Sequence, residues 1–343
     1  MKNITPIILS SLFLLPAIST VQAAALSNHP SDNKSSNQIA QNIDPELQQL
    51  DQAQKQASTN VNRIAKDITV RITSGTNGGS GVLIAKKGNT ALGNNQGAIS
   101  DFDRVISLQE RSEIAIDPQS AEAYNNRGNA KSALGDKQGA IADYNLAIKI
   151  NPNFAEAYYN RGVDKSALGD KQGAIADYNL AIKINPNFAE AYYNRGVDKS
   201  ELGDKQGAIA DYNLAIKINP NDANAYYNRG NAKSELGDKQ GAIADYNLAI
   251  KINPNDAQAY YNRGVDKSEL GDKQGAIADY NLAIKINPNL AEAYSNRGVV
   301  KSELGDKQGA IADLSKAAEL FRQQGQMDNY QQAMGLIAKL KWS

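Results

Sequence analysis

The stretch AEAYYNRGVDKSALGDKQGAIADYNLAIKINPNF, from Ala155 to Phe188, recurs with few changes through the C-terminal two thirds of the chain. An arginine marks the same place in every copy, with a spacing of 34 residues: Arg127, Arg161, Arg195, Arg229, Arg263 and Arg297. A fixed period of this length is typical of a solenoid, in which each unit contacts its neighbours and none buries its apolar face alone. The sequence therefore predicts one array of stacked units.

Each unit carries the signals for two antiparallel helices. In the quoted copy, Gly169 ends a first helix at a position where glycine adopts a left-handed backbone at low cost. Asp170 is placed to cap a second helix, which stops before Pro186. Asn153 and Glu156 predict a capping box at the start of the first helix. The expected unit is a helix hairpin with a tight turn.

Small residues indicate where the two helices of a unit touch. Gly162, Ala174 and Ala181 allow the backbones to approach, and Tyr158 and Tyr178 fill the space between them. Glycine inside a helix costs about 1 kcal/mol relative to alanine. Because Gly162 has a counterpart in every unit, we expect a close contact there that offsets the cost.

This pattern of Tyr, Gly, Ala, Tyr, Ala and Pro at 34-residue spacing resembles the tetratricopeptide repeat. The resemblance covers residues 91–343 as a partial first repeat, six further repeats and a capping helix from about Met327 to Leu340. The apolar side of this helix is predicted to be Met334, Ile337 and Leu340. It implies an all-α fold, a right-handed superhelical solenoid of antiparallel helix pairs. The segment from Thr90 to Gly128 is eight residues longer than its equivalents, which predicts a lengthened first helix.

Two positions depart from the usual choices of that family. Arg161 stands where leucine is common and Lys165 where tyrosine is common. A buried guanidinium needs a carboxylate partner. Asp177 has a counterpart in all six units, whereas Asp164 is replaced in three of them, so we expect Asp177 to be the partner. The arginines are interpreted as structural rather than ligand-binding.

In the tetratricopeptide repeat the first helices line a concave groove that holds extended peptides or partner helices. Carried onto this sequence, the groove residues are Asn126, Asn160, Asn194, Asn228, Asn262 and Asn296, with Tyr159, Tyr193, Tyr227 and Tyr261. An amide offers both a donor and an acceptor, so such a row can bind a peptide backbone without selecting its sequence. The alternative is that these asparagines are solvated or bond the neighbouring helix.

The N-terminal residues 1–25 have the pattern of a secretory signal. Lys2 supplies the positive start, Ile7 to Leu15 an apolar core, and Ala23 a small residue at the cleavage site. The alternative, an uncleaved anchor, needs about 20 clean apolar residues, more than this run contains. We expect a bacterial Sec-type signal and a periplasmic or secreted product with no membrane span. Residues 26–58 then form a polar linker with a weak helix.

Residues 59–90 predict a short helix and an orphan β-hairpin, with strands near Ile68–Ile72 and Val82–Ile84 around a glycine-rich loop. This fragment resembles the opening of secreted bacterial trypsin-like serine proteases. A serine nucleophile needs a base and a group that orients it. The single histidine, His29, lies in the polar linker, and Ser80 lies in the loop of the hairpin. The sequence thus predicts a truncated fragment with no catalytic residues.

Composition narrows the function further. The 37 basic and 37 acidic residues balance, which argues against nucleic acid as a partner. There is no cysteine and one histidine, so disulfides, thiol catalysis, a metal and a cofactor are not expected. The favoured hypothesis is a non-catalytic secreted scaffold for peptides or proteins. One alternative is a protease or its regulator, of which the enzymatic form is disfavoured because no histidine follows His29. The other is a remnant of a repeat-containing protease without a dedicated partner.

Overall fold

The structure is a computed structural model, and it describes residues 70–72, 81–83, 95–111 and 118–342. The chain divides into two compact units, Met1–Arg63 and Ile64–Ser343, and all described residues belong to the second. The predicted signal, the polar linker with its weak helix and the short helix of residues 61–66 lie outside the described residues. These assignments, and the domain boundaries drawn from them, stay predictions.

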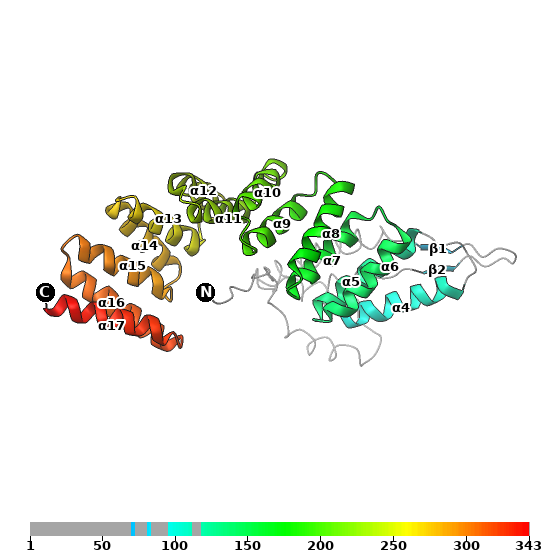
Figure 1. The fold of residues 1–343 in the computed structure, drawn as a ribbon. Helices are drawn as coiled ribbons and strands as arrows, with labels where there is room; N and C mark the ends of the chain where they lie inside the picture. Colours follow the sequence, from blue (N-terminus) through cyan, green and yellow to red (C-terminus); the bar gives the residue numbers. More distant parts are fainter. Residues whose placement is uncertain (1–69, 73–80, 84–94, 112–117, 343) are drawn as a thin grey trace, which may run out of the picture. The chain divides into compact units, whose positions relative to one another are not determined.

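Two short strands precede the helices. Strand β1 spans Val70–Ile72 and strand β2 spans Gly81–Leu83. They pair antiparallel, with Val70 opposite Leu83 (Figure 1). The connecting loop and the residues on either side lie outside the described residues. An independent hairpin and its kinship with a protease therefore stay predictions.

The rest of the described chain is helical, and its elements follow one another in pairs (Figure 1). The helices are α4 Asn95–Arg111, α5 Pro118–Ala133, α6 Lys137–Ile150, α7 Ala155–Ala167, α8 Lys171–Ile184, α9 Ala189–Glu201, α10 Lys205–Ile218, α11 Ala223–Glu235, α12 Lys239–Ile252, α13 Ala257–Glu269, α14 Lys273–Ile286, α15 Ala291–Glu303, α16 Lys307–Gln323 and α17 Met327–Trp342. Helix α4 has 17 residues and its equivalent α6 has 14, as the inserted sequence predicts.

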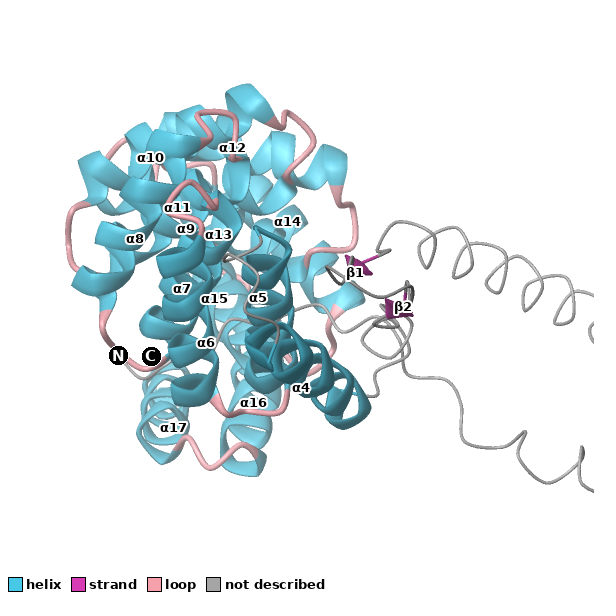
Figure 2. Ribbon diagram, turned by 90° about the vertical axis from the view of Figure 1, so that its right-hand side faces the viewer, coloured by secondary structure: helices cyan, strands magenta, loops and turns pink. Residues whose placement is uncertain are grey.

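Each first helix packs on the second helix of its own repeat, and each second helix packs on the first helix of the next. Thus α7 contacts α8, α8 contacts α9, and the first helices α7 and α9 also touch. Figure 1 shows the pairs following one another in this order, and Figure 2 shows the same helices turned by 90°. The predicted array of helix hairpins is confirmed. Its geometry places consecutive first helices side by side, so their side chains can interact across the repeats.

The turn between paired helices forms as the sequence predicts. Gly169 has a φ of 91°, in the left-handed region that favours glycine. The side chain of Asp170 then accepts a hydrogen bond of 2.9 Å from the backbone N–H of Gly173 and caps α8. The same two features recur in every complete repeat.

The predicted capping box at the first helix is wrong. The N-cap residue of α7 is Phe154, and no side chain caps it. Asn153 instead donates its backbone N–H to the side chain of Asn151, 3.0 Å away, because the residues around the proline form a turn of their own and the helix starts later. At the equivalent position of α11, Asp222 does cap the helix.

The close contact expected at Gly162 is present. A Cβ at this position would lie 2.7 Å from a ring carbon of Tyr178 and 3.2 Å from the carbonyl oxygen of Ala174. The Tyr178 side chain is 1% exposed. The tyrosine therefore packs directly against the glycine backbone, and this contact leaves no room for a larger residue.

Helix α17 covers the last repeat with part of the predicted face, since Leu340 is half-buried and Ile337 is buried. Ala333 and Ile337 are buried, whereas Met334 is 43% exposed. Tyr330 lies on the same face as the buried pair and packs against the cluster of Leu320 and Phe321. Residues 330, 333 and 337 share one side of a helix, and Met334 is rotated away from it. The prediction is correct for Ile337 and wrong for Met334, because the position of a side chain around the helix axis decides which residues are buried.

Candidate functional site

The recurring arginines lie in ion-pair clusters within each repeat. In α7 and α8, Arg161 donates from Nε to Asp177 Oδ2 at 2.8 Å and from Nη2 to Asp177 Oδ1 at 2.5 Å. Lys165 Nζ lies 2.8 Å from the same Oδ2. Asp177 is 2% exposed, so both cations compensate a buried carboxylate. The predicted partner of the arginine is confirmed.

The same arginine also reaches the preceding repeat. Its Nη1 donates to Asn145 Oδ1 of α6 at 2.6 Å, and its guanidinium lies 5.4 Å from the ring centre of Tyr158. We call this set, with its equivalents in the other repeats, the arginine cluster. Because its donors are used within the fold, the arginine cluster holds repeats together and is not a free anion site.

The predicted groove asparagines bond from one first helix to the one before it. Four of them donate from Nδ2 to a tyrosine hydroxyl of the preceding repeat: Asn194 to Tyr159 at 2.9 Å, Asn228 to Tyr193 at 2.8 Å, Asn262 to Tyr227 at 3.0 Å and Asn296 to Tyr261 at 3.0 Å. The structure thus brings the predicted asparagines and tyrosines together as one ladder, in which each asparagine and the tyrosine that it bonds form one rung. It also realises the alternative, in which the amides bond the neighbouring helix.

Each rung of this ladder keeps hydrogen-bonding capacity. Among the described residues, no hydrogen bond uses the Oδ1 of Asn194 or the hydroxyl proton of Tyr159. Burial is the main cause that raises the pKa of Tyr159, and it raises the pKa of Tyr193 to about 12. These hydroxyls therefore stay protonated at neutral pH. Every rung offers one donor and one acceptor, and both side chains of a rung are half-buried.

The first rungs differ. Asn160 donates to Asn125 Oδ1 at 3.0 Å, because the repeat that begins at Ala121 has asparagine in place of the tyrosine. Asn126 forms no side-chain hydrogen bond to another described residue. The row of predicted residues is therefore continuous from Asn160 to Asn296, and Asn126 stands apart from it.

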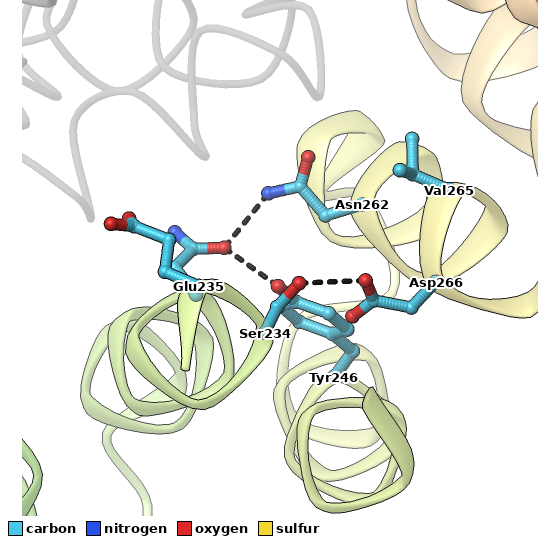
Figure 3. A pocket seen from close by; sticks show the side chains of 7 residues that line it. Ser234, Glu235, Tyr246, Asn262, Val265 and Asp266 are labelled. Atoms are coloured by element: carbon cyan, nitrogen blue, oxygen red, sulfur yellow. Dashed lines mark hydrogen bonds between the residues drawn. The ribbon is translucent and has the colours of Figure 1, made fainter. Parts of the chain in front are cut away.

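A pocket lies between the first helices α11 and α13, above α12 (Figure 3). Its volume is about 250 Å³, and its wall includes Asn231, Ser234, Tyr246 and Asp266. Of the predicted residues only Asn262 lines it. Tyr246 donates its hydroxyl to Asn231 Oδ1 at 2.8 Å, and Asn262 Nδ2 donates to the same oxygen at 2.8 Å (Figure 3). In the sequence, Asn231 and Asp266 could have been found from the variation between repeats at the ninth and tenth positions of the first helix.

Three of the six repeats bury an aspartate at the tenth position of the first helix. Each accepts a 2.6 Å hydrogen bond at Oδ1 from a serine of the preceding repeat: Ser132 to Asp164, Ser166 to Asp198 and Ser234 to Asp266. The Oδ2 atoms of all three are buried and have no hydrogen-bond partner. Burial is the largest cause acting on Asp198, and it raises the pKa of that carboxyl. Sequence reasoning assigned these aspartates no role.

Within the described residues, no helix is both long and apolar enough to cross a bilayer. The same residues contain no group of His, Cys, Asp and Glu side chains that could hold a metal ion.

Comparison with known structures finds several similar folds. A crystal structure of MamA is 30% identical over 48% of this chain and 96% of its own, with a TM-score of 0.47. A tetratricopeptide repeat protein from Parabacteroides merdae is 21% identical over 72% of this chain and 95% of its own, with a TM-score of 0.52. Pseudomonas aeruginosa pilF is 16% identical over 63% of this chain and 97% of its own, with a TM-score of 0.55. A search of curated proteins finds no match.

Family models agree with the period of the sequence. Models described as tetratricopeptide repeat match residues 121–154, 155–188, 223–256 and 291–324, and one described as TPR repeat matches 200–237 and 268–305. Together they account for more than half of the chain, and the described fold has the expected pairs of helices. The chain belongs to the tetratricopeptide-repeat family.

Proposed function

We propose that the chain is a non-catalytic, exported scaffold that holds an extended peptide or protein partner along its first helices. The observation that carries this proposal is the ladder of tyrosines and asparagines. Each rung presents one protonated hydroxyl and one amide oxygen, which complement the C=O and N–H of a peptide group.

Regular spacing favours an extended partner. The rungs recur once per repeat, so a chain that satisfies one of them meets the same donor and acceptor at the next. Tyrosine also adds stiff apolar area with a polar end, which suits a peptide-binding surface. Because the rungs are alike, backbone recognition is the expected mode, and any preference for particular side chains must come from positions that differ between repeats.

A display experiment tests the proposal. The folded chain would be immobilised and used to select peptides from a random library, and the selected peptides would be titrated while the side-chain amide signals of Asn194, Asn228 and Asn262 are followed by NMR. We expect these signals to shift on binding, and we expect Asn228→Ala to weaken it.

Asn187→Ala is the matched control, since Asn187 is exposed in a turn between helices. It should leave the affinity unchanged. Selected peptides that shift only signals of the second helices would contradict the proposal, as would equal affinities of the two variants.

Export is the second half of the proposal and rests on residues 1–25. Expression in a bacterium followed by fractionation and N-terminal sequencing should recover a chain that starts near Ala24 outside the cytoplasm. An intact Met1 in the cytoplasmic fraction would refute export and leave the binding proposal standing.

A further inference from the structure

The pocket between α11 and α13 carries a negative charge that the fold neutralises only in part. Asp266 is 1% exposed, and its Oδ1 accepts hydrogen bonds from Ser234 Oγ at 2.6 Å and faces Lys239 Nζ at 3.2 Å. Its Oδ2 has no partner. An ionised carboxylate can accept about four hydrogen bonds, so half of this capacity is unused by the described residues.

The ion pairs around the pocket leave one negative charge in excess. Lys239 Nζ also lies 2.8 Å from Glu269, and Lys205 Nζ lies 2.7 Å from Glu235, a further residue of the pocket wall. Three carboxylates, those of Glu235, Asp266 and Glu269, thus share two ammonium groups. A buried or half-enclosed carboxylate without full compensation favours the approach of a cation.

The size and the lining of the pocket restrict which kind of cation can bind there. A volume of about 250 Å³ is smaller than the sites that enclose a whole drug-sized ligand, and it suits one long side chain. The wall supplies Val265 as apolar surface and Asn231, Tyr246 and Asp266 as polar groups. An aliphatic stem with a charged end matches this combination. The carboxyl group of Asp266 can turn to meet it, since the second side-chain torsion of aspartate is broad.

Part of the same arrangement occurs a second time in the chain. At the junction of the first helices α5 and α7, Tyr144 donates to Asn129 at 2.9 Å. Asp164 accepts from Ser132 and from Lys137 Nζ at 3.0 Å, and its Oδ2 is again unpartnered. The three remaining junctions have valine in place of the asparagine, at Val163, Val197 and Val265. Two of them also lack the aspartate, because Ala232 and Val300 are found at its position. The combination is therefore specific to two places, three repeats apart.

We propose that these two junctions, and foremost the pocket beside Asp266, receive basic side chains of the bound partner. This inference rests on the proposed function and assigns the partner's chemistry: an extended peptide with lysine or arginine residues spaced to reach both junctions. The ladder holds the backbone of that peptide, and the buried aspartates select its cations.

The test uses the full chain and two blocked peptides that differ at one position, with a lysine in one and the uncharged norleucine in the other. Acetylation of the N-terminus leaves the lysine as the only ammonium. NMR titration measures both affinities and follows the side-chain amides of Asn231 and Asn262. We expect the lysine peptide to bind about tenfold more tightly than the norleucine peptide, because one charge-assisted hydrogen bond contributes about that much to affinity.

The double variant Asp164→Ala, Asp266→Ala should abolish that preference. It is expected to fold, because Ala130 and Ala232 are found at the same position in two native repeats. Asp198→Ala is the matched control: it removes an equally buried aspartate from a junction that has valine in place of the asparagine, and it should keep the preference.

The outcomes separate the two proposals. If both peptides bind equally and shift the ladder amides, the inference is overturned and the scaffold function stands. A preference for lysine that persists in the double variant overturns the inference as well. If neither peptide nor any peptide selected by display binds along the first helices, the proposed function and the inference fall together.

Discussion

The arginine clusters and the junctions between first helices differ in how uniform they are. Every complete repeat has the same Arg, Lys and Asp at the same distances, within about a tenth of an ångström of 2.8 Å for the Nε–Oδ2 bond. The junctions instead vary among Asn with Asp, Val with Asp, Val with Ala and Val with Val. The uniform part is what each repeat needs to fold, and the variable part is where repeats can differ in what they bind.

The largest expected effect comes from breaking one arginine cluster. Arg229→Met keeps an aliphatic stem over Tyr226 but leaves Asp245, which is 2% exposed, with Lys233 alone. Loss of one partner of a buried ion pair destabilises by about 3 kcal/mol or more. Chemical denaturation measures the change. The control is Arg322→Met at an exposed arginine, which should be nearly neutral. Equal effects of the two substitutions would show that the cluster does not stabilise the fold.

A smaller effect is expected from the contact inside a repeat. Gly162→Ala adds a Cβ 2.7 Å from Tyr178, and overpacking costs about 1–3 kcal/mol, more than the gain in helix propensity of about 1 kcal/mol. Gly335→Ala in α17 meets no atom within 4 Å, so it should raise the melting temperature by propensity alone. Thermal unfolding of both variants gives the comparison. Stabilisation by Gly162→Ala would mean that the Tyr178 side chain can move aside without a loss of stability.

The junction hydrogen bonds should contribute less. Tyr227→Phe removes one of the two acceptors of Asn262 Nδ2 and leaves the other, Asn231 Oδ1, so we expect a loss of about 1 kcal/mol or less. Tyr226→Phe is the control on the same helix, since the hydroxyl of Tyr226 forms no hydrogen bond with another described residue. Denaturation of both should show a loss only for the first. If they lose the same amount, the rung is not a stabilising contact.

The smallest effect is a difference in pH dependence between the two regions. Burial acts on Asp313 of the last cluster, but hydrogen bonds from Arg297 and Lys301 outweigh it and lower its pKa. Its contribution to stability is therefore present above the unfolded pKa, about 3.9, and is lost as pH falls through the folded value. Asp198 has a raised pKa, so as the pH falls its carboxylate takes up a proton in the folded chain before it does so in the unfolded chain. The folded state therefore gains stability relative to the unfolded chain as the pH falls.

Carboxyl NMR signals measure this difference directly. The midpoint of Asp198 should lie above the ordinary value for aspartate and that of Asp313 below it. A midpoint of Asp198 at or below that of Asp313 would contradict the assignment of uncompensated charge to the junctions.

Much of the array could be predicted because the residues that specify it lie close together in the sequence or recur in every repeat. Gly169 and Asp170 specify the turn within a few residues of themselves, and the recurrence of Asp177 in all six units identified the partner of Arg161. The start of the first helix was misjudged, because Asn151 and Asn153 compete for the same turn and their sequence does not rank the two. Met334 was wrongly placed on the buried face of α17, because that face depends on the angle at which the helix docks.

By itself, the sequence determined the repeat, the helix hairpins and the residues that line consecutive first helices. Only the tertiary structure decided what those residues do for one another. The amide of Asn194 and the hydroxyl of Tyr159 are 35 residues apart, and they meet because the stacking of repeats sets one first helix beside the next. The unpartnered oxygen of Asp266 is likewise a property of the packing, since burial and the absence of a donor both arise when α11, α12 and α13 close around it.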